Sequence, residues 1–442
     1  MLTPGDRAGT QTAAMNPDRA TAWPISRREL LERRSASQLL DRRTHGGPEA
    51  AVRALLAVQA QDRAAWRLAL RARVEGITAD DVNRALTEER SLLVAWLNRG
   101  TLHVVCAEDY PWLQALTGPT LVVGNARRLA QEGLSPDDVE RGIGCIERSL
   151  LSEGPLTRAQ LRDRLAGRGI RTEGQALVHL LFGAVIRGLA VMGPMVGGQH
   201  AFAHAREWLG PGSVAPSLPG RDVALAELAR RYLVGHGPAT DADLARWAGL
   251  PLRDARSGLS AVGAELAELG GGLVDLAGRW PAERGGIART ASAGGSASAG
   301  GSASSGGSAP GGAKSSPLPP RLLPSWDPCL VGWRGREPFL DSTTEPKVIP
   351  PGGGLFRPFA TVDGVGAATW GMRRNGDQVA VRIEPFEDLD PEAESALQAE
   401  AADVARFEGR ILVARPAVAS DAGRSSGATG FDGPATGATL GE

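Results

Sequence analysis

Cysteine is scarce in this sequence, and its positions exclude two classes of protein. Only three cysteines occur in 442 residues, Cys106, Cys145 and Cys329, and no two of them form a Cys-x-x-Cys pair. A disulfide-stapled secreted domain and a zinc ribbon both need closely spaced pairs. We therefore expect no metal, no disulfide framework and a reduced, cytoplasmic protein.

Long hydrophobic runs are also missing. No run of roughly 18 apolar residues, the length needed to cross a bilayer, is present. The first residues lack the basic and apolar regions of a signal peptide. We expect neither a membrane partner nor secretion. Phosphate-binding loops are missing too, since Gly352-Gly-Gly354 lacks the Lys and the Ser or Thr of a P-loop.

Lysine is nearly absent, and the charge is balanced overall but not locally. The 49 basic residues, all but two of them arginine, face 50 acidic ones, which gives a net charge of −1. This balance argues against a nucleic acid partner, because phosphate neutralisation dominates such binding. However, residues 26–73 hold 11 arginines against five acids, whereas residues 383–442 hold four against 12. We expect a basic surface over the first segment, although such a run is equally typical of a solvated helix face with i,i+4 ion pairs.

One stretch, Leu55–Asp62, differs from the rest of the chain. An Ala- and Leu-rich helical pattern over residues 49–58 runs into Gln59, Ala60, Gln61 and Asp62. Residues two apart diverge on a helix but share a face on an extended chain, and we expect the chain to leave the helix here. Glutamine is uncharged at every pH, so the pair cannot transfer protons as a carboxylate would, but it can position a water.

Hairpin and repeat signals organise the chain around this stretch. Residues 92–106 have the composition of a β-hairpin, with the turn at Asn98-Arg99-Gly100. Residues 154–166 match residues 237–249, with Thr157 and Thr240 at equivalent helix N-cap positions. Around the first copy, helices are predicted near 136–152 and 173–188, followed by a Gly-rich strand pair near 190–202. Around the second copy, helices are predicted near 222–236 and 251–268, followed by a Gly-rich strand pair near 272–280.

This order of elements is that of a winged helix-turn-helix. We predict an α+β fold in which three tandem winged helix-turn-helix modules precede a small β-barrel-like domain and form a concave DNA-binding cradle. The expected parts are a disordered lead-in (1–25), winged helices 1 to 3 (26–125, 126–215 and 216–284), a disordered Gly/Ser/Ala linker (285–317), a β-domain with a closing helix (318–417) and a disordered tail (418–442).

Three segments resemble one known family. They are Leu56-Ala-Val-Gln-Ala-Gln-Asp62, Asn98-Arg-Gly-Thr-Leu-His-Val104 and Leu322-Leu-Pro-Ser-Trp-Asp-Pro-Cys-Leu-Val-Gly-Trp-Arg334. In order and content they resemble the winged-helix DNA glycosylases of the AlkZ/YcaQ-like family, whose Gln-aliphatic-Gln or Gln-aliphatic-Asp motif is catalytic. The chain carries the first form. It departs from the family in having Trp326 where a Tyr is usual and a long low-complexity insert before the third segment.

The resemblance implies a monofunctional glycosylase that hydrolyses the N-glycosidic bond of alkylated purines in double-stranded DNA, without a cofactor. The lesion could be an N7-alkylguanine, a bulky adduct or an interstrand crosslink, in DNA repair or in self-resistance to a genotoxic natural product. The candidate residues are Gln59 and Gln61 as catalytic, Asp62, His103 and Asp327 as supporting, and Arg67, Arg71, Arg99, Thr101, Arg334 and Arg336 as DNA-binding.

Several alternatives stay open from the sequence. Asp62 either adds charge or caps a helix, and His103 either supports the site or is satisfied within a sheet. Arg334 and Arg336 contact DNA or are solvated loop charges. Trp66 is expected in the core rather than as a base-stacking platform. A non-catalytic winged-helix regulator would share the basic segment, and a protein-interaction scaffold would fit the balanced charge. A monomer is the expected state.

Overall fold

The computed structural model describes residues 25–210, 220–280, 316–352 and 354–413. The expected lead-in, Gly/Ser/Ala linker and tail lie almost entirely outside these ranges. Among the described residues, no helix combines the length and the apolar composition needed to cross a bilayer.

The first unit is built from four helices, a short strand and a hairpin. Its elements are α1 (Arg27–Ser37), α2 (Pro48–Leu55), β1 (Val58–Gln59), α3 (Ala65–Arg71), α4 (Ala79–Thr87), β2 (Leu92–Leu97) and β3 (Thr101–Cys106). Ser26 begins α1 by accepting a hydrogen bond from the Glu29 amide, and Thr78 begins α4 with a full capping box. The predicted hairpin is confirmed, since β2 and β3 pair in register through a turn in which Asn98 and Gly100 have positive φ.

The repeat predicted from residues 154–166 and 237–249 is present as two capped helices. Thr157 caps α7 (Arg158–Ala166) and Thr240 caps α11 (Asp241–Ala248), each with a capping box. The second unit comprises α6 (Pro136–Glu153), α7, α8 (Ala176–Ile186), β4 (Ala190–Val196), β5 (Gln199–His204) and α9 (Ala205–Leu209). The third comprises α10 (Arg221–His236), α11, α12 (Leu252–Ala261), the 3-10 turn Gly263–Glu265, β6 (Leu266–Gly270) and β7 (Leu273–Leu276).

Two boundaries differ from the sequence prediction. Helix α5 (Tyr110–Gln131) runs without a break across the expected boundary between residues 125 and 126. Helix α12 was predicted to continue to residue 268, but it ends at Ala261, and a strand begins at Leu266. The reason is the hairpin turn at Gly270, Gly271 and Gly272, all with positive φ, which requires a paired strand on both sides.

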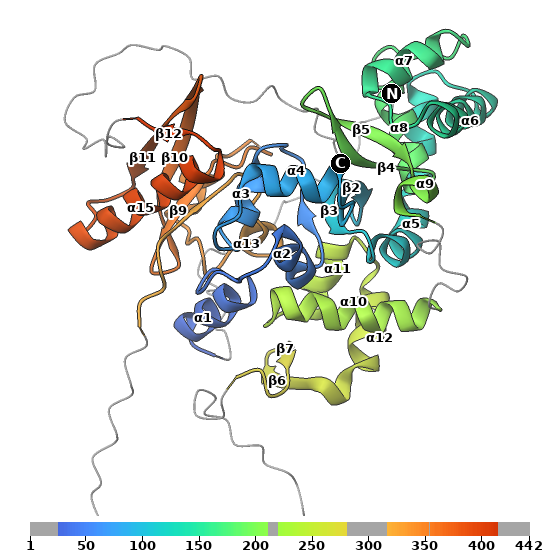
Figure 1. Cartoon of the computed structure of the whole chain (residues 1–442). Coiled ribbons are helices and arrows are strands. Elements are labelled where there is room, and N and C mark those ends of the chain that lie inside the picture. The colour runs from blue at the N-terminus through green and yellow to red at the C-terminus, as the bar shows by residue number, and fades with distance from the viewer. Residues whose placement is uncertain (1–24, 211–219, 281–315, 353, 414–442) are drawn as a thin grey trace, which may run out of the picture.

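Two five-stranded sheets organise the molecule. The first has the order β1-β3-β2-β4-β5, so hairpins of the first and second units join in one sheet through the pair Val94 and Met192. The second lies in the C-terminal unit, with α13 (Pro328–Val331), α14 (Glu345–Val348) and α15 (Pro391–Phe407), shown in orange and red in Figure 1. Its strands are β8 (Arg321–Leu323), β9 (Phe359–Val362), β10 (Val365–Asn375), β11 (Gln378–Pro385) and β12 (Ile411–Leu412).

The C-terminal sheet forms a half-barrel that is not closed. Its order is β12-β11-β10-β9-β8, and its two edge strands do not pair with each other within the described residues. The predicted closing helix is confirmed as α15, whose Leu397, Ala401 and Val404 are buried. The apolar face of the helix therefore covers surface that a closed barrel would bury by itself.

Buried ion pairs attach the first unit to the C-terminal unit. Arg73 binds both carboxylate oxygens of Asp327 at 2.7 and 2.9 Å, and neither side chain has any exposed surface. Gln38 accepts a further bond from Arg73 and donates to the Gly235 carbonyl of α10. Arg71 is equally buried. Its Nη1 atom lies 3.0 Å from a carboxylate oxygen of Glu400 and 3.0 Å from one of Asp403, and both acids belong to α15.

These contacts correct the interpretation of the Arg-rich segment. Arg33, Arg34, Arg71 and Arg73 are buried, so much of the positive charge expected on a DNA-facing surface lies inside the protein. The prediction that Arg71 binds DNA is therefore wrong. Asp327, expected to support the site, is a structural partner of Arg73. The i,i+4 pairs Arg28–Glu32 and Arg33–Glu29 match the alternative of a self-neutralised helix face.

Replacing Asp327 by alanine tests the weight of this connection. The substitution leaves the Arg73 guanidinium buried without its partner, and we expect the free energy of unfolding to fall by about 3–5 kcal/mol, measured by denaturant unfolding. Asp163→Ala is the matched control. The side chains of Asp163 and its partner Arg162 are 59% and 53% exposed, so loss of this ion pair should cost less than about 1 kcal/mol. Equal small losses in both variants would show that the buried pair does not hold the units together.

Candidate active site

The chain leaves the helix where the sequence predicted. Helix α2 ends at Leu55, Leu56 turns the backbone with φ 65°, and β1 follows at Val58. A positive φ is uncommon for a bulky residue and persists only where packing enforces it. Gly235 of α10 supplies that packing, since a Cβ there would lie 2.7 Å from the Ala54 carbonyl oxygen. The close approach of α10 thus fixes the point at which the extended segment begins.

The two glutamines lie beside the edge of the first sheet. Gln59 pairs with His103 of β3, and the Ala60 amide donates to the Leu102 carbonyl at 2.7 Å, so the extended segment continues past Gln59. Gln59 is 6% exposed, whereas Gln61 is exposed. One amide therefore lies at the base of the site and the other faces solvent.

Both amide groups are oriented by donors that cannot accept. The Gln59 Oε1 atom faces Nη2 of Arg99 at 3.4 Å, and the Gln61 Oε1 atom faces the Leu102 amide at 3.4 Å. A guanidinium and a backbone N–H only donate, so each amide must turn its oxygen, not its NH2 group, toward them. A carbonyl oxygen has two lone pairs, and one on each glutamine is left for a water.

Asp62 acts as a helix cap. Its Oδ1 atom accepts from the amides of Ala64 and Ala65 at 2.8 and 3.1 Å, at the start of α3. This is the second of the two roles that the sequence left open for Asp62.

Arg99 connects the site to the third unit. Its Nη1 atom donates to the carbonyls of Arg246 and Trp247 at 3.0 and 3.1 Å, at the C-terminal end of α11. Helix C-termini carry free carbonyls and partial negative charge, which suits a cation. Gly249 follows with φ 69°, and a Cβ there would lie 2.9 Å from the Arg99 amide nitrogen. The turn that carries Arg99 is therefore held against α11.

His103 is a neutral, buried residue of the sheet. Its Nδ1 atom lies 2.9 Å from the Thr101 carbonyl oxygen, which makes Nδ1 the protonated nitrogen. Burial, with a smaller contribution from the nearby Arg99 charge, lowers the pKa of His103 to about 3. Such a histidine does not transfer protons near neutral pH. The Oγ1 atom of Thr101, next to it, is buried without a hydrogen-bond partner.

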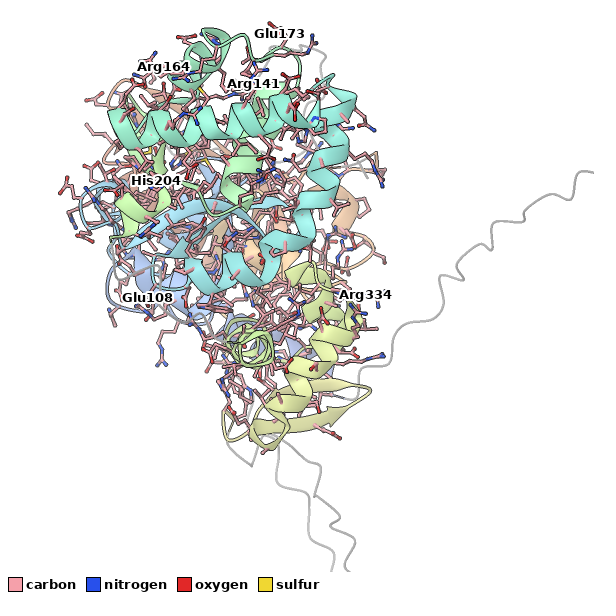
Figure 2. The ribbon with its side chains drawn as sticks, turned by 90° about the vertical axis from the view of Figure 1, so that its right-hand side faces the viewer. Glu108, Arg141, Arg164, Glu173, His204 and Arg334 are labelled. Carbon is pink, nitrogen blue, oxygen red and sulfur yellow. The ribbon has the colours of Figure 1, made fainter. Side chains whose placement is uncertain are left out.

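The remaining predicted residues are distributed over several elements. Arg67 lies on α3 above the ring of Trp66, which is buried as expected. Arg334 is exposed beside the third unit, where its backbone amide donates to Asp243 of α11 (Figure 2). Arg336 forms an ion pair with Glu345 at 2.8 Å. The structure thus gathers Gln59, Gln61, Arg99, Thr101 and His103, and places Arg71 and Asp327 elsewhere.

The carbonyl contacts of Arg99 could not be found from the sequence. They join residues 147 and 148 positions apart, and backbone carbonyls leave no mark on residue identity. The only related signal was Gly249, which ends the repeated helix, and glycine is common at that position for local reasons alone.

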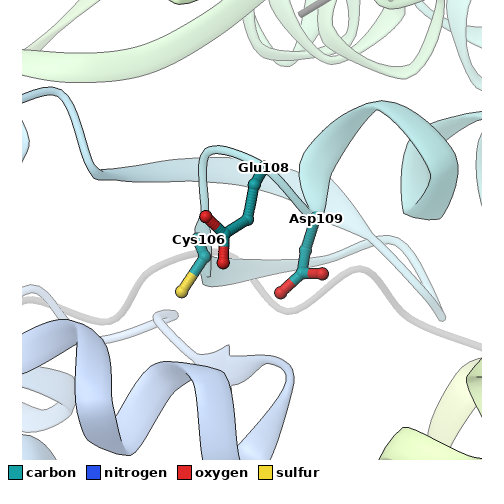
Figure 3. Close-up of side chains that lie close together, drawn as sticks. All are labelled: Cys106, Glu108 and Asp109. Atoms are coloured by element: carbon teal, nitrogen blue, oxygen red, sulfur yellow. The ribbon is translucent and has the colours of Figure 1, made fainter. Parts of the chain in front are cut away.

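One cluster elsewhere has the composition of a metal site. Cys106, Glu108 and Asp109 offer ligand atoms within 4.8 Å of one another (Figure 3). Asp109 is bound by both terminal nitrogens of Arg231 at 3.0 and 2.9 Å, and Glu108 by Arg53. Burial raises the pKa of the Cys106 thiol to about 12. A metal needs the thiolate and free carboxylates, so these residues serve ion pairing instead.

Comparison with known proteins gives a family and a fold. A family model described as "DNA glycosylase AlkZ-like" matches residues 52–407. The solved structure of Streptomyces sahachiroi DNA glycosylase AlkZ is similar with a TM-score of 0.65 and 23% identity, over 88% of this chain and 100% of that one. Comparison with curated protein sequences finds no match. The family match covers most of the chain, and the structural likeness confirms a mixed α and β fold of the same kind.

The low pKa of His103 predicts how stability depends on pH. Between about pH 3 and 6.5 the unfolded histidine binds a proton that the folded one does not, so the free energy of unfolding falls as the pH drops below 6.5. The loss from this group should reach about 2 kcal/mol at pH 5. We expect His103→Asn, which keeps a donor toward Thr101, to lose less stability between about pH 7.5 and 5 than the wild type. Denaturant unfolding at both pH values measures this, and equal losses would contradict it.

Proposed function

The chain belongs to the AlkZ-like DNA glycosylase family and is a DNA glycosylase that acts on damaged DNA, and from that premise we propose that it is a monofunctional enzyme which hydrolyses the N-glycosidic bond of alkylated purines in double-stranded DNA. The observation that carries the proposal is the pair Gln59 and Gln61, whose amide oxygens are oriented by donor-only groups beside the edge of the first sheet.

The chemistry of an alkylated purine suits a site without a general acid. Alkylation at N7 or N3 places positive charge on the base, so the base leaves as a neutral molecule without being protonated. Ordinary glycoside hydrolysis needs a carboxylic acid and a carboxylate, because its leaving oxygen is poor. Here His103 has a pKa of about 3, and Asp62 uses Oδ1 to cap α3. The immediate surroundings of the glutamines thus favour a substrate whose leaving base is already positively charged.

In the proposed step, the free lone pairs of the two amide oxygens hold a water beside C1′ of the damaged nucleotide. The water oxygen bonds to C1′ as the C1′–N9 bond of the purine breaks, and the electron pair of that bond goes to the base. The sugar passes through an oxocarbenium-like state, which the amide dipoles stabilise. The proton of the attacking water passes to solvent. No cofactor takes part.

The arrangement of the units supports DNA as a large, cradled substrate. We propose that each of the first three units is a winged helix, because in each of them helices precede a β-hairpin. Helix α8 is buried along its length, whereas α12 exposes Arg253 and Arg256 by 85% and 65%. Of the second and third units, only the third thus exposes the helix that follows its capped repeat helix, α12, to DNA phosphates. This supports contact with the DNA backbone rather than reading of the base sequence.

The range of lesions follows from the openness of the site. Gln61 lies at the surface, and an exposed catalytic group is compatible with a bulky adduct or an interstrand crosslink as well as an N7-alkylguanine. Repair, or self-resistance to an alkylating natural product, is the role we propose, for a cytoplasmic monomer on the nucleoid.

Base excision from duplex DNA carrying an N7-alkylguanine tests the proposal. We expect Gln59→Ala and Gln61→Ala each to lower the single-turnover rate of base release by roughly 100-fold or more, because each removes one oriented dipole. Gln131→Ala on the exposed end of α5 is the matched control and should keep the wild-type rate. Salt-dependent DNA binding without any base release by the wild type, on small and bulky lesions alike, would favour a non-catalytic regulator.

A second experiment separates positioning by Arg99 from DNA contact. If Arg99 orients the Gln59 amide, Arg99→Met should lower the rate of base release at saturating DNA by roughly 10- to 100-fold with little change in DNA affinity. Arg253→Gln, which removes one exposed cation from the third unit, should leave the rate at saturating DNA unchanged. A loss of affinity in Arg99→Met with the rate at saturation intact would show that Arg99 is a DNA contact, as the sequence alone indicated.

A further inference from the structure

Arg67 is a partly buried cation without a carboxylate partner. Within the ranges that the structure describes, no acidic group lies within 4 Å of its guanidinium, and its Nη2 atom is buried with no hydrogen-bond acceptor. Its Cζ atom lies 5.3 Å from the centroid of the Trp66 ring. Desolvation lowers the pKa of Arg67, which is the expected sign for a charge that its surroundings do not compensate.

Other unpaired groups surround the same space. The ring of His200, on β5, lies 6.4 Å from that of Trp66, and both His200 Nδ1 and Trp66 Nε1 are buried without partners. Arg63 is exposed and, like Arg67, lies near enough to lower the pKa of His200, although burial is the larger cause. Three nitrogen-bearing side chains of the first unit thus converge on the β4–β5 hairpin of the second.

The acids nearest to this cluster do not neutralise it. Glu408 and Asp80 act on Arg67 only through space. Glu408 already binds Arg374 through both carboxylate oxygens, at 2.7 and 2.9 Å. Four residues further along the chain, Arg71 has two carboxylates at 3.0 Å. The fold therefore places acids beside Arg71 of α3 but pairs none with Arg67 of the same helix.

An uncompensated cation in a partly buried position is unfavourable unless an anion joins it. We propose that Arg63, Arg67 and His200 form a binding site for a backbone phosphate of DNA, between α3 and the β4–β5 hairpin. The proposal rests on the proposed function in taking DNA as the ligand. Arg63 and Arg67 follow Gln61 by two and six residues, so a phosphate bound here would place the duplex across the exposed end of the site.

The site is distinct from the catalytic glutamines in what it does. Guanidinium groups bind phosphate through several N–H donors, and such contacts fix the register of DNA without reading its sequence. The second unit thereby contributes to DNA binding through its hairpin, even though its helix α8 is buried.

Binding of an undamaged duplex at several salt concentrations tests the site. Loss of one phosphate contact makes the slope of log K against log salt less negative by about one, so we expect this for Arg67→Met and for Arg63→Gln, and about twice this change for the double variant. Arg162→Met in the second unit, which removes an exposed cation paired with Asp163, should leave the slope unchanged.

Stability without DNA distinguishes a ligand site from a structural role. Because Arg67 has no acidic partner in the described part of the free protein, Arg67→Met should unfold at the same or a higher denaturant concentration than the wild type. A destabilised Arg67→Met together with unchanged salt slopes in both single variants would overturn the proposal. Arg63→Gln keeps the test decisive if Arg67→Met folds poorly, since Arg63 is exposed.

Two further results separate this proposal from related ones. Inorganic phosphate at fixed ionic strength should not raise the Tm of the wild type; a rise that Arg67→Met abolishes, with unchanged duplex slopes, would assign the site to free phosphate instead. The Gln59→Ala/Gln61→Ala variant should keep the wild-type salt slope. Shifted slopes in the arginine variants, combined with no base release by the wild type, would support the phosphate site and refute the glycosylase mechanism.

Discussion

The buried pairing of arginines from one short segment with acids near the far end of the chain is the constraint on which the rest of the structure depends. Arg71 is the last residue of α3 and Arg73 lies two residues beyond it, and their partners Glu400 and Asp327 lie 329 and 254 residues later. Because a buried guanidinium must meet its partners in one geometry, α3 is fixed relative to the C-terminal unit. The extended segment with the glutamines enters α3 through the Asp62 cap, so its position is set by the same contacts.

Local signals in the sequence were sufficient for the elements around the site. The change from helix to extended chain at residues 55–59, the 92–106 hairpin and the caps at Thr157 and Thr240 all depend on residues close in sequence, and all are present in the structure. The extent of α12 was predicted wrongly, and the half-barrel form of the C-terminal sheet was predicted only as barrel-like, because both depend on what a strand pairs with. Strand pairing is decided by tertiary contacts, not by propensity alone.

Arginine shows most clearly where prediction from sequence ends. Arg67, Arg71 and Arg99 carry the same side chain, yet the structure leaves Arg67 without an acidic partner, places two acids beside Arg71, and holds Arg99 against the carbonyls of α11. The count of charges over residues 26–73 predicted a basic surface from Arg67 and Arg71 alike. What separates these roles is the placement of acceptors more than a hundred residues away, which charge patterning does not encode.

The sheet shared by the first two units limits how a chain of this kind can change during evolution. Tandem units joined only by linkers can be lost or exchanged one at a time. Here β4 is the neighbour of β2, so a descendant that lost the second unit would expose the backbone N–H and C=O groups along β2 as an unprotected edge, open to association with other chains. A replacement would have to bring its own strand to that edge, whereas the tips of the hairpins are free to lengthen. Lineages should therefore differ in the lengths of these hairpins and keep the number of units.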